Sequence, residues 1–343
     1  MIGMVMISSF RRFIITYRIF GKTKKRDFHK KPIPNSCGVV FLFLFILGLI
    51  ILEPFIVKKD LTGLIAGGFI ICVVGFWDDL KIMRAYKKLF YQIIAIFFIV
   101  VHNQLAVQNL HGFLGIEILN PFVGLAFTTF IGVFMINAFN LIDGIDGLSG
   151  FISIISFAAF SVVFWILDYK GYFGACFLMI GIVASYLPFN FSTKRKVFMG
   201  DSGSMFIGYI LFVMTMLVVN TNAPVSFTLD FDRMILPIAP LVIFIIPIID
   251  SASIYLYRLY LGRSPFSADK FHLHHLVLLF TKSHLVTSLV ITTALILFIF
   301  VFSLLAFRTT TLFVVCSYFV LIFSMILLTS IFRIRFKKQL SLL

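Results

Sequence analysis

Seven aspartates stand at the ends of long apolar runs or in the polar loops between them, in a chain that carries little negative charge. Only 14 of the 343 residues are Asp or Glu. Carboxylates at the border of an apolar layer are expensive and are usually retained for function. They can hold a divalent cation, and one member of a close pair can take up a proton and act as a base. The seven positions are Asp78, Asp79, Asp143, Asp146, Asp201, Asp250 and Asp269.

The first group, 75–79 (GFWDD), places Asp78 and Asp79 side by side at the end of an apolar run. An adjacent pair of acids can bind a divalent cation, although a solvated helix end would look the same. The basic residues that follow could grip a lipid phosphate, or could simply extend their charged ends into water. They are Lys81, Arg84, Lys87 and Lys88.

The second group, 137–148 (NAFNLIDGIDGL), is dense in polar residues although apolar runs flank it. Its two Asp-Gly pairs predict a tight turn, and glycine lets the backbone approach a ligand closely. An ordinary turn with side-chain caps is the alternative. The density of polar groups beside apolar runs argues against an ordinary turn, because polar groups are expensive at the depth of a membrane. The candidate residues are Asn137, Asn140, Asp143 and Asp146.

The third group, 198–204 (FMGDSGS), lies just before a new apolar run. The N-terminus of a helix there would attract phosphate oxygens, and Asp201 could hold Mg²⁺. Phe198 would offer an accessible ring beside it. The alternative is a simple helix cap formed by the aspartate or a serine.

The fourth group, 258–275, gathers three of the seven histidines at His272, His274 and His275. A zinc site is disfavoured because no cysteine accompanies them. Arg258, Arg263 and Lys270 lie nearby, so anion binding fits better, with a surface cluster of no function as the alternative.

Phosphoryl transfer needs a metal that bridges phosphate oxygens, cations that neutralise charge and a positioned nucleophile. The four groups together supply aspartates for a metal, basic side chains for phosphates and an aromatic ring on which a nucleobase could stack. Their place at the ends of apolar runs suits one water-soluble substrate and one lipid substrate.

The apolar runs themselves predict an all-α, polytopic transmembrane helical bundle with 1–343 as a single domain. Hydrophobic residues make up 61% of the chain and charged residues 13%, whereas soluble domains carry about 25% charged residues. Segment 1–20 is split by arginines and is either an eleventh span or an interfacial helix. Ten further runs approach the length of about 20 residues that a span needs: 38–57, 61–77, 88–103, 121–140, 147–167, 171–190, 203–220, 234–257, 285–306 and 310–331.

The net charge of +15 is explained by basic residues in the loops between the predicted spans, so it does not indicate a nucleic-acid partner. Twenty-one of the 29 Lys and Arg residues fall on one side of the predicted membrane. The positive-inside rule places that side, and the four groups with it, in the cytoplasm. We therefore expect a cytoplasmic-face active-site cleft. The loops concerned are 21–37, 78–88, 191–202, 258–284 and 332–343.

The four groups, with 29–34 (HKKPIP), resemble in content and order the motifs of the bacterial polyprenyl-phosphate N-acetylhexosamine-1-phosphate transferases of glycosyl transferase family 4. These enzymes are relatives of phospho-N-acetylmuramoyl-pentapeptide transferase. The resemblance covers nearly the whole chain. It departs from the family at Cys37-Gly38, where the family has two glycines, and at the first apolar segment, which is shorter than the family's first span.

The resemblance implies roles for the candidate residues. Asp201 and Asn140 would bind Mg²⁺, with Mn²⁺ as an alternative, and Phe198 would stack on uracil. Asp78 and Asp79 would position or deprotonate the lipid phosphate, and Lys88 would bind it. Asp143 and Asp146 would organise the nucleotide pocket. The remaining residues would bind substrate, with contacts to pyrophosphate and sugar from the last four: Asn137, Arg263, His272, His274 and His275.

The implied reaction transfers N-acetylhexosamine-1-phosphate, with N-acetylglucosamine expected, from a UDP-sugar to undecaprenyl phosphate in the lipid bilayer of the bacterial inner membrane. A homodimer is left open. One alternative is phospho-N-acetylmuramoyl-pentapeptide transferase, which the His-x-His-His form disfavours. The other is a carboxylate-coupled transporter, whose acids should lie near the membrane midplane rather than at one face.

Overall fold

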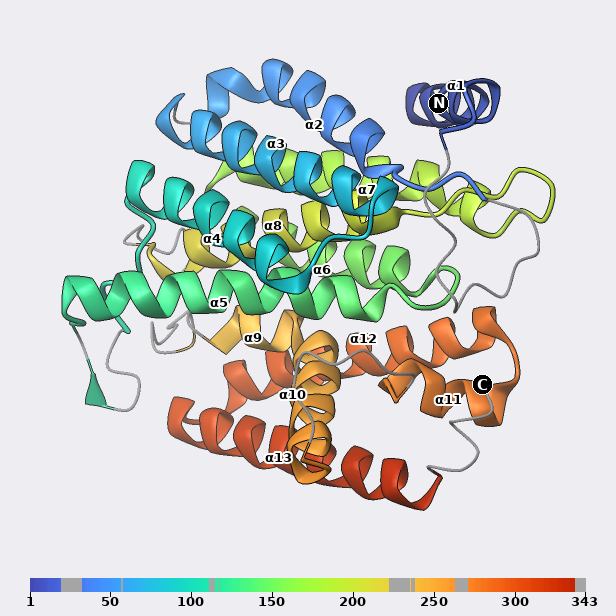
Figure 1. The fold of residues 1–343 in the computed structure, drawn as a ribbon. Coiled ribbons are helices and arrows are strands. Elements are labelled where there is room, and N and C mark those ends of the chain that lie inside the picture. The colour runs from blue at the N-terminus through green and yellow to red at the C-terminus, as the bar shows by residue number, and fades with distance from the viewer. Residues whose placement is uncertain are drawn as a thin grey trace.

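The computed structural model describes residues 1–19, 33–56, 58–110, 115, 116, 118–221, 235, 238–262 and 271–336 (Figure 1). Within these residues the chain is helical. The only β pairing among them is a single bridge between Asn109 and Ile118.

Nine helices of the described chain are long and apolar enough to cross a membrane. This confirms the predicted all-α polytopic membrane fold, because a helix satisfies its own backbone hydrogen bonds in lipid. The nine are α2 (Gly38–Leu52, continued by the short helix η1, Glu53–Phe55), α3 (Lys58–Leu80), α4 (Ala85–His102), α5 (Pro121–Ile142), α6 (Leu148–Ile166), α7 (Lys170–Asn190), α8 (Gly200–Val219), α12 (His284–Arg308) and α13 (Thr311–Arg335).

Two expected spans take a different form. Segment 1–20 gives α1 (Ile2–Thr16), whose 15 residues reach about 22 Å, less than the hydrocarbon thickness of about 30 Å. Segment 234–257 is divided between α9 (Ile238–Ile243) and α10 (Ile245–Tyr260). Pro247 has no N–H to donate to the carbonyl of Ile243, so a continuous helix would lose a hydrogen bond at this junction. The described chain thus has nine continuous spans rather than ten or eleven.

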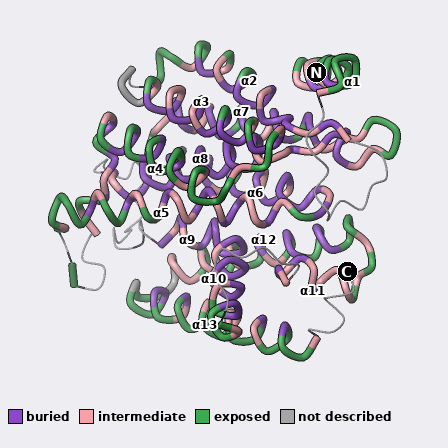
Figure 2. Tube along the Cα trace, in the orientation of Figure 1, coloured by how far each residue is buried: buried purple, intermediate pink, exposed green. Residues whose placement is uncertain are grey.

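Helix α8 lies at the centre of the bundle, and its whole span is buried by neighbours that include α3, α5 and α2 (Figure 2). The end of α3 and the start of α2 come very close to its first turn. A Cβ atom added at Gly75 would overlap the backbone at Ser202, and one added at Gly38 would overlap Gly203. These two glycines therefore allow three helix ends to meet where acidic residues are concentrated.

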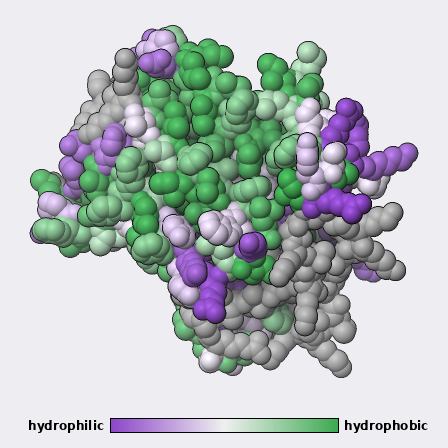
Figure 3. Space-filling view, turned by 45° about the horizontal axis from the view of Figure 1, so that its top comes forward, coloured by the Kyte–Doolittle hydropathy of each residue, from purple (hydrophilic) through white to green (hydrophobic). Residues whose placement is uncertain are grey.

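The outer helices keep apolar side chains on the surface. The spans of α12 and α13 are only 17% and 22% buried, and Phe300 and Phe323 are exposed. Figure 3 shows broad apolar areas, with hydrophilic side chains gathered towards the margins. A lipid-facing surface explains this distribution, and the chain is a multi-pass membrane protein.

The C-terminal helices pack on this bundle, with α10 on α5 and α12 on α6. Helix α11 (Leu273–Thr281) follows α10 and leads into α12. In Figure 1, α10 lies across the direction of α13, against which it packs, and it also packs on α5.

Candidate active site

Lys88 lies at the centre of a cluster that joins four helices. Its Nζ lies 2.8 Å from Asp201 Oδ2 and 3.3 Å from Asp78 Oδ2, and it donates to Asn140 Oδ1 at 3.4 Å. The lysine and the two carboxylates are at most 19% exposed. Groups from three of the four motifs, predicted from separate parts of the sequence, therefore meet at one ammonium group. We call these four residues the carboxylate–lysine cluster.

The neighbouring aspartates of the first motif have different surroundings. Asp78 faces Lys88, and its Oδ1 accepts a hydrogen bond from the backbone N–H of Met83 at 2.6 Å. Asp79 accepts from the backbone N–H groups of Asp201, at 2.8 Å, and Ser202, at 3.1 Å. The first N–H groups of a helix have no partner within the helix, and a carboxylate there stabilises the helix. Asp79 thus fixes the start of α8, and with it the backbone of Asp201.

The two asparagines of the second motif also differ. Asn140 Nδ2 donates to Asp201 Oδ1 at 3.1 Å and to Ser204 Oγ at 2.8 Å, so Asn140 belongs to the cluster. Asn137 forms a reciprocal amide pair with buried Gln92, with distances of 2.7 and 3.3 Å. Asn137 therefore joins α4 to α5 beneath the cluster.

Asp143 is the first residue of the turn that follows α5. Burial raises its pKa to about 6, and the negative charge of Asp201 acts in the same direction. A hydrogen bond from Ser149 Oγ, at 2.6 Å, opposes this rise because it stabilises the ionised carboxylate. The effect of Asp201 on Asp143 links the turn electrostatically to the carboxylate–lysine cluster.

Asp146 lies on the other side of the turn between two basic residues. Burial alone would raise its pKa, but hydrogen bonds from His284 and Lys196 hold the pKa below its usual value. The distances to Asp146 Oδ2 are 2.6 Å from Lys196 Nζ and 3.3 Å from His284 Nδ1. Lys196 Nζ also lies 5.5 Å from the ring centroid of Phe198, within the range of a cation–π contact. Phe198 is therefore held beside the turn, with part of its surface still accessible.

The histidines gather around one buried carboxylate. Asp250 Oδ2 lies 2.9 Å from His272 Nδ1, and the ring of His272 stacks on that of His274 with centroids 5.6 Å apart. His275 lies next to His274, at 4.3 Å between centroids. Burial lowers the pKa of His274 well below its usual value, so this ring is neutral. Arg263, predicted to bind substrate with these histidines, lies outside the described residues.

The histidines meet the second motif through a glycine. A Cβ atom at Gly144 would overlap the His274 ring, so the tight Asp-Gly turn packs directly against it. Both ring nitrogens of His274 are buried without a hydrogen-bond partner among the described residues. Buried polar atoms are usually paired, so this ring has hydrogen-bonding capacity that a bound molecule could use.

The oxygens around Lys88 are those that Mg²⁺ prefers. Asp78, Asn140 and Asp201 all direct oxygens to one cation, and the carboxylate and amide oxygens are hard ligands. Among the described residues, no three His, Cys, Asp or Glu side chains form a metal-binding group by themselves. The set still fits Mg²⁺, which commonly takes one or two carboxylates and completes its shell with water and substrate phosphates.

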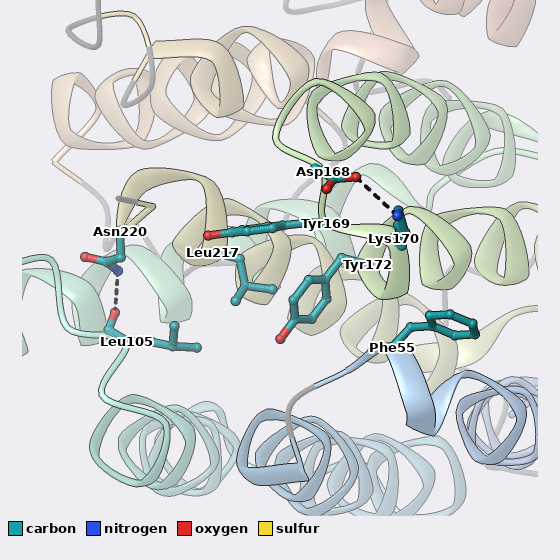
Figure 4. A pocket seen from close by; sticks show the side chains of 8 residues that line it. All are labelled: Phe55, Leu105, Asp168, Tyr169, Lys170, Tyr172, Leu217 and Asn220. Atoms are coloured by element: carbon teal, nitrogen blue, oxygen red, sulfur yellow. Dashed lines mark hydrogen bonds and ion pairs between the residues drawn. The ribbon is translucent and has the colours of Figure 1, made fainter. Parts of the chain in front are cut away.

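At the opposite ends of α4 and α8, a cavity of about 410 Å³ lies between these helix ends, η1 and the connection from α6 to α7 (Figure 4). Asn220, after α8, donates to the carbonyl of Leu105 at 3.1 Å on one side of it. Asp168 and Lys170, between α6 and α7, form a largely exposed ion pair of 3.8 Å on the other. None of the described residues of the predicted site lines this cavity, so the cavity is separate from the site.

Several contributors to the site were not predicted from the sequence. Lys196 stands two positions before Phe198, and its place in a charged loop could have drawn attention to it. Arg333, whose Nη2 donates to Asp250 Oδ1 at 3.1 Å, follows the apolar run 310–331 closely, and a charge so near a span is expensive unless it has a role. Ser149 and His284 give no such signal, because their importance follows only from the folded positions of their partners.

Comparison with known proteins agrees with these motifs. Residues 61–219 match the profile of glycosyl transferase family 4. The chain is 30% identical over 278 residues to the undecaprenyl-phosphate alpha-N-acetylglucosaminyl 1-phosphate transferase of Salmonella typhi, across 78% of this chain and 71% of the relative. It is 31% identical over 165 residues to the protein of the same name from Escherichia coli (strain K12), across 47% of this chain and 42% of the relative.

A third relative comes from Mycobacterium tuberculosis. The decaprenyl-phosphate N-acetylglucosaminephosphotransferase of Mycobacterium tuberculosis (strain ATCC 25618 / H37Rv) is 29% identical over 286 residues, across 76% of this chain and 69% of the relative. The extent of these matches and the motifs that fold together identify the chain as a member of glycosyl transferase family 4.

Proposed function

We propose that the protein transfers N-acetylglucosamine-1-phosphate from UDP-N-acetylglucosamine to undecaprenyl phosphate. The observation that carries this proposal is the convergence of Asp78, Lys88, Asn140 and Asp201 at one end of a membrane-spanning bundle. Such a site can meet a lipid phosphate from the bilayer and a nucleotide sugar from water. The relatives' names contain both a polyprenyl phosphate and N-acetylglucosamine.

In this reaction an oxygen of the lipid phosphate attacks the phosphorus that bears the sugar. A new P–O–P linkage forms to the lipid, the bond from that phosphorus to the oxygen of the uridine phosphate breaks, and UMP leaves with the bonding electrons. The lipid phosphate is already ionised at neutral pH. Asp78 therefore needs to position the acceptor through Lys88 rather than remove a proton from it.

The phosphates bring several negative charges to this site, and Lys88 can bind those of the acceptor once its ammonium turns from Asp201. Asp201, Asn140 and Asp78 are the residues that would hold Mg²⁺, or Mn²⁺ in its place. When bound, the metal neutralises charge on the phosphate oxygens. Phe198 and the Asp143–Asp146 turn would hold the uridine, and the histidines would contact the sugar and pyrophosphate.

The site would face the cytoplasm of the bacterial inner membrane, since the basic loops lie on its side. The relatives' names favour N-acetylglucosamine over the muramoyl-pentapeptide of the peptidoglycan enzyme. The charged groups lie at the ends of helices, which also argues against a transporter, whose coupled acids would lie near the midplane.

The direct test is UMP release from purified protein supplied with Mg²⁺, undecaprenyl phosphate and a panel of UDP-sugars. We expect UMP and a lipid-diphosphate sugar with UDP-N-acetylglucosamine. Chelation with EDTA should stop the reaction, and Mg²⁺ or Mn²⁺ should restore it. Absence of UMP with every donor would refute the transferase proposal, whereas preference for UDP-N-acetylmuramoyl-pentapeptide would redirect it to the peptidoglycan reaction.

A further inference from the structure

We propose that Arg333, near the end of the last helix, is a positioning residue for the histidine loop, which we define as Phe271–His275. Through that loop it would position the nucleotide sugar, a ligand whose identity rests on the proposed function. Arg333 lies outside the residues that match the family profile, and the four sequence motifs do not include it.

Arg333 is fully buried although it carries a positive charge. Its Nε donates to the carbonyl oxygen of Phe271 at 2.5 Å, and its Nη2 donates to Asp250 Oδ1 at 3.1 Å. Burying a charge is expensive unless the group is paired and hydrogen-bonded. The planar guanidinium group can make both bonds at once, which a lysine ammonium cannot do with the same geometry.

The carboxylate that Arg333 contacts also holds the start of α11. Asp250 Oδ1 accepts from the backbone N–H of Leu273 at 2.6 Å, and its Oδ2 lies 2.9 Å from His272 Nδ1. The N–H of Leu273 is one of those that have no partner within the helix. Arg333 thus fixes the loop twice, directly at the Phe271 carbonyl and through Asp250 at the next two residues.

This anchoring sets the position of the remaining histidines. The rings of His272 and His274 are nearly parallel, with an interplanar angle of 6°, and His274 packs on Gly144 of the Asp-Gly turn. If residues 271–273 shift, these rings shift relative to Asp143 as well. An ionised carboxylate only accepts hydrogen bonds, so His272 carries its proton on Nδ1 towards Asp250 and leaves Nε2 for another partner.

The same helix offers a matched control two residues further on. Arg335 is exposed and lies over the ring of Phe336, with its guanidinium carbon 5.9 Å from the centroid. Replacing either arginine removes one positive charge from the end of α13. Only replacement of Arg333 removes the two bonds that hold the histidine loop.

The experiment compares Arg333→Gln, Arg333→Lys and Arg335→Gln in the purified full-length chain. We expect Arg333→Gln to lower kcat/KM for UDP-N-acetylglucosamine about 100-fold, the scale of a misplaced reactive geometry, without changing the KM for undecaprenyl phosphate. Arg333→Lys should recover part of the loss, because it keeps the charge beside Asp250. Arg335→Gln should match the wild type.

A purely structural role gives a different result. Equal losses for both substrates that follow the folded fraction, measured by thermal unfolding, would overturn the positioning role, as would equal kinetics of Arg333→Gln and Arg335→Gln. If Arg333→Gln does not fold, Arg333→Lys decides instead. It should then lower kcat/KM for UDP-N-acetylglucosamine and leave the KM for undecaprenyl phosphate unchanged.

A second measurement does not depend on turnover. Amide hydrogen exchange over 272–276 should be faster in Arg333→Gln or Arg333→Lys than in Arg335→Gln, and unchanged exchange would overturn the proposal. If the wild type releases no UMP from any donor, the proposed function fails. The exchange result would still decide whether Arg333 holds the loop.

Discussion

The two sides of the site hold their charged groups in different ways. On the α3, α4, α5 and α8 side, one ammonium group is shared among two carboxylates and an amide. On the α10, α11 and α13 side, one carboxylate is shared among an arginine, a histidine and a backbone N–H. The first arrangement centres on a lysine, whose four-carbon side chain has many rotatable bonds, and the second on a short, buried aspartate.

This contrast indicates a division of work. Lys88 can leave its partners for a phosphate without breaking the fold, because Asp79 and the α3–α8 contact hold the helices independently of it. Asp250 cannot change partners without releasing the start of α11. The carboxylate–lysine side is therefore suited to the reacting phosphates, and the histidine side to holding the donor in place.

The largest expected effect is that of Asp201→Asn. The substitution preserves shape but removes the charge that Lys88 and a metal would share. We expect turnover to fall by about 10³-fold or more, because charge stabilisation of the transition state is usually the largest contribution to catalysis. UMP release measures the loss, and thermal unfolding checks that the variant folds.

Asp168→Asn is the matched control for this prediction, since Asp168 lies at the other end of the bundle in an exposed ion pair. It should retain wild-type turnover. If Asp201→Asn loses less activity than Arg333→Gln, the assignment of the chemistry to the carboxylate–lysine side is wrong.

A smaller loss is expected for Lys88→Gln. The amide can still donate a hydrogen bond but cannot neutralise a phosphate, so we expect kcat/KM for undecaprenyl phosphate to fall about 100-fold. The KM for the UDP-sugar should change much less. Steady-state kinetics with each substrate varied in turn measure this difference.

The control for this variant is Lys87→Gln, because Lys87 is adjacent and exposed. It should behave as the wild type. A Lys88→Gln variant that impairs use of the donor and the acceptor equally would contradict the division of work between the two sides.

The sequence predicted the positions of the helices far better than the contacts between their side chains. The expected spans 88–103 and 171–190 agree with α4 and α7 to within three residues at each end, because hydropathy responds to length and polarity. The segment 234–257 was wrong as one span, since hydropathy does not register the hydrogen bond that Pro247 cannot make.

The site shows the same limit. Sequence reasoning found the aspartates of the carboxylate–lysine cluster because acids beside apolar runs are conspicuous. It also gave Asp78 and Asp79 a shared role, whereas the folded helices turn one towards Lys88 and the other to the start of α8. The pairing of Asp250 with Arg333, 83 residues away, arises only when α10 packs on α13.

The smallest expected effect tests the junction between the two sides, where Asp143 begins the turn after α5. Ser149→Ala removes the hydrogen bond that stabilises the ionised carboxylate, so the pKa of Asp143 should rise above about 6. If ionised Asp143 is needed for donor binding, the acid limb of the kcat/KM profile moves to higher pH by about one unit. Activity then falls near pH 6 and is unchanged near pH 8.

The control is Ser153→Ala, which removes a buried hydroxyl one turn further along α6 that donates to the carbonyl of Ser149 at 2.6 Å. It should leave the acid limb in place. Equal profiles for both serine variants would mean that Asp143 does not titrate in the active range, and the junction would then serve packing through Gly144 and His274 rather than charge.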